Sequence, residues 1–236
     1  MRLNENLILA YQKTILVPYK KVHVEQYHEW MKSPFLQEMT ASEPLTLEEE
    51  YDMQKSWHED DRKCTFIILA LKENTQLDSN MTSTEIQENT KMIGDVNIFL
   101  NDQDEDLTFG EIEIMIAEED YRRSGHGLLG LKMMMAFALK ELGLKTFHAK
   151  ISMKNQPSIQ LFEKKLSYYL VSSSEIFQET TLEWSINQPL ISTTVSDDDD
   201  VQYGSLATQD QKELCQKMNK ALIKLWDDDI IKMKWN

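Results

Sequence analysis

Cysteine is scarce in this sequence, and the two cysteines lie far apart. Cys64 and Cys215 are the only ones among 236 residues. A disulfide framework needs several cysteines, and a zinc site needs closely spaced pairs, so the sequence predicts neither. We expect both side chains to be plain thiols in a reducing compartment such as the cytoplasm, and we expect no metal cofactor.

Long apolar runs are missing as well. No segment approaches the roughly 20 consecutive apolar residues that a membrane-spanning helix requires. The N-terminal residues lack the apolar centre of a secretory signal. Hydrophobic residues nevertheless make up 41% of the chain, as in ordinary globular proteins, and 236 residues are enough for one good-sized domain or for one domain plus an appendage. The sequence therefore predicts a globular protein with no membrane partner.

Positive charge is in short supply. Lys and Arg total 25 against 40 Asp and Glu, which gives a formal net charge of −15. Such a surface repels phosphate backbones, so the composition predicts no nucleic-acid partner. Part of the excess lies in two runs, Asp197–Asp200 and Asp227–Asp229. We interpret these runs as solvated chain, the alternative being attraction to a basic partner or a positively charged peptide substrate.

Strand and helix patterns alternate along most of the chain. Glu111–Ala117 alternates strictly between polar and apolar residues and gives the clearest strand. Thr46 precedes Glu49 by three residues, a capping box that starts a helix reaching about Trp57. The predicted strands cover 14–18, 64–71, 91–100, 111–117, 145–151, 168–175 and 177–184, the predicted helices cover 22–31, 46–57, 127–142 and 155–166, and a polar loop is predicted over 72–90.

The composition changes after Trp184. Residues 185–210 are rich in Ser, Thr, Asp and Gln, and we interpret them as an acidic polar linker. Residues 211–226 place apolar side chains on one side of a helix. Such a helix docks on its own domain, frays, or binds a partner, and the sequence leaves these alternatives open. The predicted organisation is a domain over 1–184, the linker, and a helical tail over 211–236.

The turn between the strand at 111–117 and the following helix has the clearest chemistry. Gly125 and Gly127 lack Cβ atoms, so successive backbone N–H groups can approach an anion at the helix N-terminus. Arg122 and Arg123 add charge and donors for phosphate oxygens. The spacing fits neither G-x-G-x-x-G nor G-x-x-x-x-G-K-[ST], which argues against a Rossmann or P-loop site.

Two motifs in this region resemble signatures of one enzyme family. The pattern R-x-x-G-x-G over 122–127 resembles [RQ]-x-x-G-x-[GA], the acetyl-CoA signature of the GCN5-related N-acetyltransferase (GNAT) superfamily. The pattern N-x-x-S-x-x-L-F over 155–162 resembles that family's second motif. The similarity covers roughly residues 7–184. It implies an α+β (mixed α/β) fold, with a mostly antiparallel twisted sheet, a central splay and about four flanking helices.

Further stretches resemble the N-acetyltransferase 9 family within that superfamily. They are Tyr27–Met31, Leu36–Glu48, Gly94–Asn97, Glu111–Glu118, Asn155–Ser158 and Ile176–Glu179. That family is described as acetylating the N-terminal residues of α- and β-tubulin in the cytoplasm. The resemblance therefore implies acetyl-CoA as cosubstrate and a protein amine, the tubulin N-terminus, as acceptor. It leaves the oligomeric state open.

The resemblance also implies roles for individual residues. In the family the pantetheine arm inserts between diverging strands, and backbone groups at the end of the first strand bind it and the thioester oxygen. Glu111 and Glu113 lie on one face of that strand, so either can be the base, the alternative being an ordinary solvated face. The residues expected to bind the cofactor are Met115, Ile116, Ala117, Arg122, Arg123, Ser124, Gly125, His126, Gly127, Asn155 and Phe162, with His126 acting through its backbone.

The sequence departs from the family pattern at several positions. Phe162 stands where many relatives have a tyrosine that protonates the leaving thiolate, and phenylalanine has no proton to give. Ser124 and Leu129 replace charged residues, and the helix exit at 164–168 lacks the usual glycine. These departures support the first of two alternatives to an active enzyme, and the second rests on the predicted tail helix. One is a protein that binds acetyl-CoA without catalysis, and the other is a tubulin-associated scaffold that acts through the tail helix.

Overall fold

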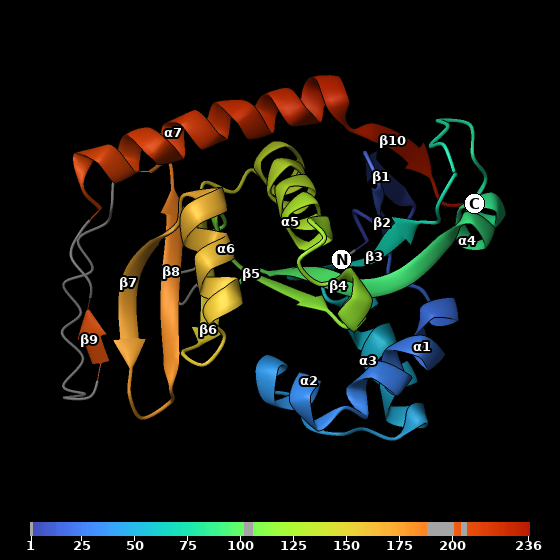
Figure 1. The fold of residues 1–236 in the computed structure, drawn as a ribbon, viewed down its shortest axis with the longest axis horizontal. Helices are drawn as coiled ribbons and strands as arrows, with labels where there is room; N and C mark the ends of the chain where they lie inside the picture. Colours follow the sequence, from blue (N-terminus) through green and yellow to red (C-terminus); the bar gives the residue numbers. More distant parts are fainter. Residues whose placement is uncertain (1, 102–105, 188–200, 204–206) are drawn as a thin grey trace.

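The computed structural model describes residues 2–101, 106–187, 201–203 and 207–236 (Figure 1). Over these ranges the chain forms one sheet of ten strands in the order β10-β1-β2-β3-β4-β5-β6-β8-β7-β9. Seven α-helices flank the described strands. The mixed, mostly antiparallel α+β fold implied by the sequence is thereby confirmed. The acidic run at 197–200 lies outside the described residues.

Most helices and strands begin and end close to where the residue patterns place them. The strands are β1 Leu7–Tyr11, β2 Thr14–Pro18, β3 Lys63–Leu71, β4 Thr90–Phe99, β5 Phe109–Ile116, β6 Thr146–Ser152, β7 Tyr169–Ser174, β8 Glu179–Ser185, β9 Val201–Tyr203 and β10 Ile231–Lys234. The helices are α1 Val24–Met31, α2 Pro34–Thr40, α3 Leu47–Glu59, α4 Ser83–Asn89, α5 His126–Phe137, α6 Gln156–Leu166 and α7 Gln209–Lys224.

The sheet buries both of its faces. Phe66 and Ile68 of β3 belong to a core cluster that includes α5 and α6, whereas Ile67 and Leu69 belong to a second cluster that includes α1. Helices α5, α6 and α7 cover one face, and α1, α2 and α3 cover the other (Figure 1). Because side chains alternate along a strand, a strand covered on both faces has a continuous apolar sequence, which is the pattern of β3.

Nearby residues cap the helix ends, and the capping box at Thr46 is the one that the sequence predicted. The Thr46 hydroxyl accepts a hydrogen bond from the Glu49 N–H, and the Glu49 carboxylate accepts one from the Thr46 N–H at 2.8 Å. Asn155 accepts a hydrogen bond from the Ser158 N–H at the start of α6. Gly143 ends the helical segment after α5 with a φ of 71°. These local bonds satisfy backbone groups that the helix ends leave over.

The polar loop predicted over 72–90 contains the helix α4, so that prediction was wrong. Thr82 and Glu85 form a capping box of the same kind as Thr46 and Glu49. Ile86 is the only large apolar side chain of α4, and it is fully buried. A single buried apolar residue produces no periodicity, which is why the pattern missed a helix whose cap was visible.

The C-terminal residues share the sheet and the core of the domain. β10 pairs antiparallel with β1, from Leu7 opposite Lys234 to Ala10 opposite Ile231. Helix α7 crosses over α5 and buries Cys215 and other apolar side chains in the same core cluster (Figure 1). Of the alternatives left open for this helix, the structure supports docking on its own domain. The predicted linker contains β9, which pairs with β7.

Deleting residues 231–236 is expected to lower the free energy of unfolding by about 2 kcal/mol or more, because it removes the buried Met233 and leaves one edge of β1 unpaired. Denaturant titration followed by circular dichroism measures the change. Lys234→Ala, at an exposed position of the same strand, is the matched control and should unfold like the full chain. Equal midpoints for the deletion and the full chain would contradict an integral β10.

Candidate active site

β5 and β6 are the parallel neighbours of the sheet, and they separate soon after they meet. Their pairing covers three residue pairs, from Phe109 opposite Thr146 to Glu111 opposite His148. β5 then continues to Ile116 with β4 on its other side, and β6 continues with β8 on its other side. Among the described strands, none fills the gap between them. The sheet therefore splays at its centre, as the sequence resemblance implied.

A cleft of about 650 Å³ opens at this splay. Its walls include both diverging strands, through residues 111–115 of β5 and 149–152 of β6. The end of α2 with the loop after it, at 38–42, and the turn between β7 and β8, at 177–179, line it as well. Pockets of this size take small molecules or the end of a peptide, so the cleft is the candidate active site.

The glycine loop beside the splay offers free backbone N–H groups. Arg123 and Gly125 have φ angles of 54° and 94°, and left-handed residues of this kind turn successive N–H groups toward one point. Helix α5 has no side-chain cap. Within the described chain, the N–H groups of Gly125, His126 and Gly127 donate to no protein group. The loop therefore fits an anion such as a diphosphate.

The turn between β1 and β2 holds the glycine loop in place. Lys13 Nζ donates to the Ser124 carbonyl at 2.5 Å, and Thr14 Oγ1 lies 2.8 Å from His126 Nδ1. Burial, and to a smaller extent Lys13, lowers the pKa of His126 to about 4, so its ring is neutral at pH 7. His126 thus positions the loop, and Lys13 brings a cation to the loop that carries serine at position 124.

Arg122 has a different contact from the one expected for a phosphate ligand. Its Nε donates to the Ile116 carbonyl at 2.9 Å, and its Nη2 donates to the Ala117 carbonyl at 3.0 Å. The guanidinium therefore ties the glycine loop to the end of β5. Arg123 is exposed, and it is the arginine of the pair that remains available for an anion.

β4 fixes the end of β5 through a close approach at Gly94. A Cβ atom on Gly94 would lie 1.9 Å from the Met115 carbonyl oxygen, so no other residue fits there. The register between β3 and β4 skips Ile93. The Ile93 carbonyl accepts the N–H groups of Ala117 at 2.9 Å and Glu118 at 3.3 Å. These contacts set where β5 ends and the loop begins.

A row of polar side chains runs across three neighbouring strands of the sheet beside the cleft. Thr65, Asn97 and Glu113 are register partners on β3, β4 and β5. The Thr65 hydroxyl donates to Asn97 Oδ1 at 2.5 Å, and Asn97 Nδ2 donates to Asp95 Oδ2 at 2.6 Å. Asp95 is 2% exposed. Burial raises the pKa of Asp95 to about 7, and Glu113 adds to this effect while the bond from Asn97 opposes it.

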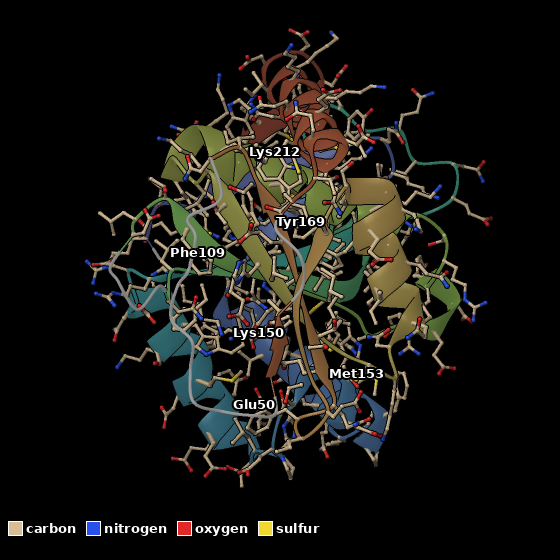
Figure 2. All side chains as sticks on the ribbon, turned by 90° about the vertical axis from the view of Figure 1, so that its left-hand side faces the viewer. Glu50, Phe109, Lys150, Met153, Tyr169 and Lys212 are labelled. Atoms are coloured by element: carbon tan, nitrogen blue, oxygen red, sulfur yellow. The ribbon has the colours of Figure 1, made fainter. Side chains whose placement is uncertain are left out.

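Glu111 and Glu113 both line the cleft, but their surroundings differ. Glu111 is buried and accepts from Lys150 at 3.0 Å and Asn101 at 2.9 Å. Figure 2 shows Lys150 at mid-height, below Lys212 of α7 and above Glu50 of α3. Glu113 reaches water along the open side of the cleft, yet the walls remove enough solvent to raise its pKa, an effect that Lys63 opposes. Glu113 is therefore the better placed of the two to contact a substrate.

The remaining predicted residues surround the splay. Met115, Asn155 and Phe162 line the cleft, and the Asn155 side chain also caps α6. Ile116 and Ala117 lie beyond the cleft at the end of β5, where their carbonyls accept from Arg122. The glycine loop, residues 122–127, is not part of the cleft lining and follows directly on β5. β5 therefore links the two parts of the candidate site.

Sequence reasoning missed one wall of the cleft. The missed residues are Tyr27, Trp57, Lys63, Asp95 and Asn97. Asp95 and Asn97 did carry a signal, because two polar residues at alternating positions interrupt an otherwise apolar strand. Tyr27 and Trp57 come from α1 and α3, and no local pattern connects residues so distant in the sequence.

The described residues contain no group of three or more His, Cys, Asp or Glu side chains that could hold a metal ion. None of the helices in the described ranges is long and apolar enough to cross a membrane. Cys64 and Cys215 are free and buried, and burial raises the pKa of their thiols to about 12 and about 11.

Comparison with known proteins gives a family and relatives. A family model described as an acetyltransferase (GNAT) domain matches residues 13–165. Alpha/beta-tubulin-N-acetyltransferase 9 of Homo sapiens is 50% identical over 189 residues, which cover 80% of this chain and 87% of that protein. The Mus musculus protein of the same name is 47% identical over 189 residues, covering 80% of this chain and 75% of its own length.

Solved structures show the same fold at low sequence identity. An acetyltransferase of the GNAT family from Bacillus anthracis superposes with a TM-score of 0.58 at 12% identity, covering 75% of this chain and 98% of its own. Spermidine N-acetyltransferase from Vibrio cholerae, solved with CoA and spermine, superposes with a TM-score of 0.56 at 13% identity, covering 72% and 93%. The similarity to these solved structures supports the fold, whereas the family is shown by the family model and by the relatives of similar sequence.

Gly94→Ala is expected to lower the free energy of unfolding by about 2–4 kcal/mol, because the added methyl collides with the Met115 carbonyl and pushes β4 from β5. Gly127→Ala is the matched control: its Cβ would meet nothing closer than 3.6 Å, so its stability should change by about 1 kcal/mol at most. Denaturant titration compares the two. Equal losses would contradict the close approach at Gly94.

Proposed function

The chain belongs to the GNAT family of acetyltransferases and is an acyltransferase, and from this premise we propose that it transfers the acetyl group of acetyl-CoA to the N-terminal amine of a protein. The observation that carries this proposal is the splay between β5 and β6, which opens directly beside the free N–H groups of the glycine loop. An extended ligand with a diphosphate at one end fits that combination.

The residues around β5 fit coenzyme A in two parts. The diphosphate would bind the N–H groups of Gly125, His126 and Gly127, with positive charge from Arg123 and Lys13. The pantetheine arm would lie along the edge of β5 that has no strand partner. Acetyl-CoA supplies an acyl thioester to the cleft, where the protein aligns it with an amine.

The cleft supplies negative charge for the incoming amine. Its carboxylates are Glu38, Asp95, Glu111, Glu113 and Glu179, against the ammonium groups of Lys63, Lys150 and Lys154. Such a lining attracts a protonated amine. Because Glu111 is already paired, Glu113 is the carboxylate we expect to contact that amine. Phe162 leaves position 162 without a proton donor, so the leaving thiolate takes its proton from another group or from solvent.

The acceptor is proposed from the relatives. The human and mouse proteins both bear the name alpha/beta-tubulin-N-acetyltransferase 9, so we propose the N-terminal residue of α- or β-tubulin as the substrate. The segments at 38–42, from α2 and the loop after it, and at 177–179, from the β7–β8 turn, both line the cleft. We propose that a peptide end enters between these two segments and presents its terminal amine to the cleft. We expect the reaction to take place in the cytoplasm.

A two-step experiment tests the proposed function. Thermal denaturation with increasing acetyl-CoA should show a rise in Tm, because a ligand that binds the folded state stabilises it. Mass spectrometry should then detect one acetyl group on the N-terminal amine of tubulin peptides, with N-terminally blocked peptides as the control. A rise in Tm without product would favour a protein that binds acetyl-CoA without catalysis. The absence of a rise would overturn the cofactor assignment.

Arg123→Glu is expected to weaken the affinity for coenzyme A about tenfold, because a charge that attracts phosphate becomes one that repels it. Isothermal titration calorimetry measures the dissociation constant. Lys217→Glu, an equal charge reversal at an exposed position of α7, is the control and should bind like the unmodified protein. Unchanged affinity in Arg123→Glu would place the diphosphate elsewhere.

A further inference from the structure

We infer that Asp95 is a catalytic residue whose carboxylate accepts the proton that the acceptor amine loses before it attacks the thioester. The inference rests on the proposed acetyl transfer and adds a residue to which no motif of the sequence gave a role. Glu113 then has a separate task, which is to hold the ammonium group of the substrate in the cleft.

Asp95 is a buried acid with unused hydrogen-bonding capacity. It lines the cleft and is 2% exposed. Its Oδ1 atom has no hydrogen-bond partner in the described structure. A buried polar atom costs free energy unless it is bonded, and a catalytic role is one established reason for a native protein to keep such an atom. The open lone pairs of Oδ1 are therefore suited to an N–H group of the substrate.

A chain of hydrogen bonds within the protein holds the second oxygen of Asp95. Oδ2 accepts from Asn97 Nδ2 at 2.6 Å, Asn97 Oδ1 accepts from the Thr65 hydroxyl at 2.5 Å, and Asn4 Nδ2 donates to the Thr65 carbonyl at 2.8 Å. Asn4, Thr65 and Asn97 are all buried. In this chain of hydrogen bonds, the protein occupies one oxygen of the Asp95 carboxyl group. It fixes the orientation of the carboxyl group and leaves the other oxygen for the cleft.

The groups around Asp95 suit a proton acceptor that works near neutral pH. The charged and titratable groups that face it or its neighbours are Lys63 of β3, Glu113 of β5, Tyr27 of α1, Glu50 of α3 and Tyr19. Burial raises the pKa of both tyrosines, so they stay neutral and leave the negative charge of this wall to the carboxylates. A base with a pKa close to the working pH is the most efficient.

The proposed step balances in protons and electrons. One N–H bond of the ammonium breaks, and its proton joins the Asp95 carboxylate. The freed lone pair on nitrogen forms the C–N bond to the acetyl carbon, and the C–S bond breaks with its electron pair on sulfur. The second proton of that nitrogen goes to the thiolate through solvent. Asp95 then returns its proton to water by way of Glu113, which reaches the open side of the cleft.

Asp95→Asn tests the inference while keeping the size and the bond from Asn97. In wild type we expect kcat for a tubulin N-terminal peptide to rise with pH through an inflection near 7, since the carboxylate must be ionised. The variant should lose that inflection and about 100-fold in kcat at pH 8, with KM little changed. Glu113→Gln is the matched comparison and should mainly raise KM. A wild-type pH profile and kcat in Asp95→Asn would overturn the inference.

A second measurement does not depend on turnover. Carbon-13 NMR of labelled aspartate should show one resonance that is missing in Asp95→Asn and that shifts when a peptide with a free N-terminal amine is added. The same peptide with an acetylated N-terminus should leave it unmoved. No response of that resonance to the free amine would overturn the inference, even in a protein that binds acetyl-CoA. A response without any acetylated product would retain Asp95 as the amine contact and reject the proposed transfer.

Discussion

The separation of β5 from β6 after three residue pairs determines what this molecule can do. Backbone N–H and C=O groups that stay unpaired inside a sheet destabilise the fold unless a partner forms hydrogen bonds with them. The described chain supplies no strand for the gap between β5 and β6. An extended ligand with amide groups can satisfy the edge as an added strand would. The same divergence opens the cleft. Cofactor and acceptor are thus expected to meet at β5, which joins the glycine loop to the carboxylates.

Local chemistry predicted most of the fold. Thr46 with Glu49 marked the start of a helix correctly, because caps depend on residues a few positions apart. The alternation in β5 was equally local. The pairing of β10 with β1 was not predictable, because it joins residues at opposite ends of the chain and short edge strands carry little pattern. The helix α4 was missed for want of a second buried apolar residue.

The candidate site was predictable only in part. The glycine loop is contiguous in sequence, so its N–H groups and the following helix were visible as a motif. The contacts of Arg122 were not, because whether a guanidinium binds a phosphate or two backbone carbonyls depends on how the loop folds back on β5. The wall with Asp95 and Asn97 was missed, although polar residues inside an apolar strand gave a signal. Contacts such as Lys13 with Ser124 require the fold itself.

An amide NMR titration with coenzyme A tests most directly whether the cofactor binds at the glycine loop and along the free edge of β5. We expect large downfield shifts of the amide protons of Gly125, His126 and Gly127, since free N–H groups gain a charged acceptor there. Amides on the β6 side of β5 should shift with them, because the pantetheine arm is placed along that edge. Saturable binding of coenzyme A that leaves the resonances of these amides unchanged would contradict a cofactor site at the glycine loop and β5.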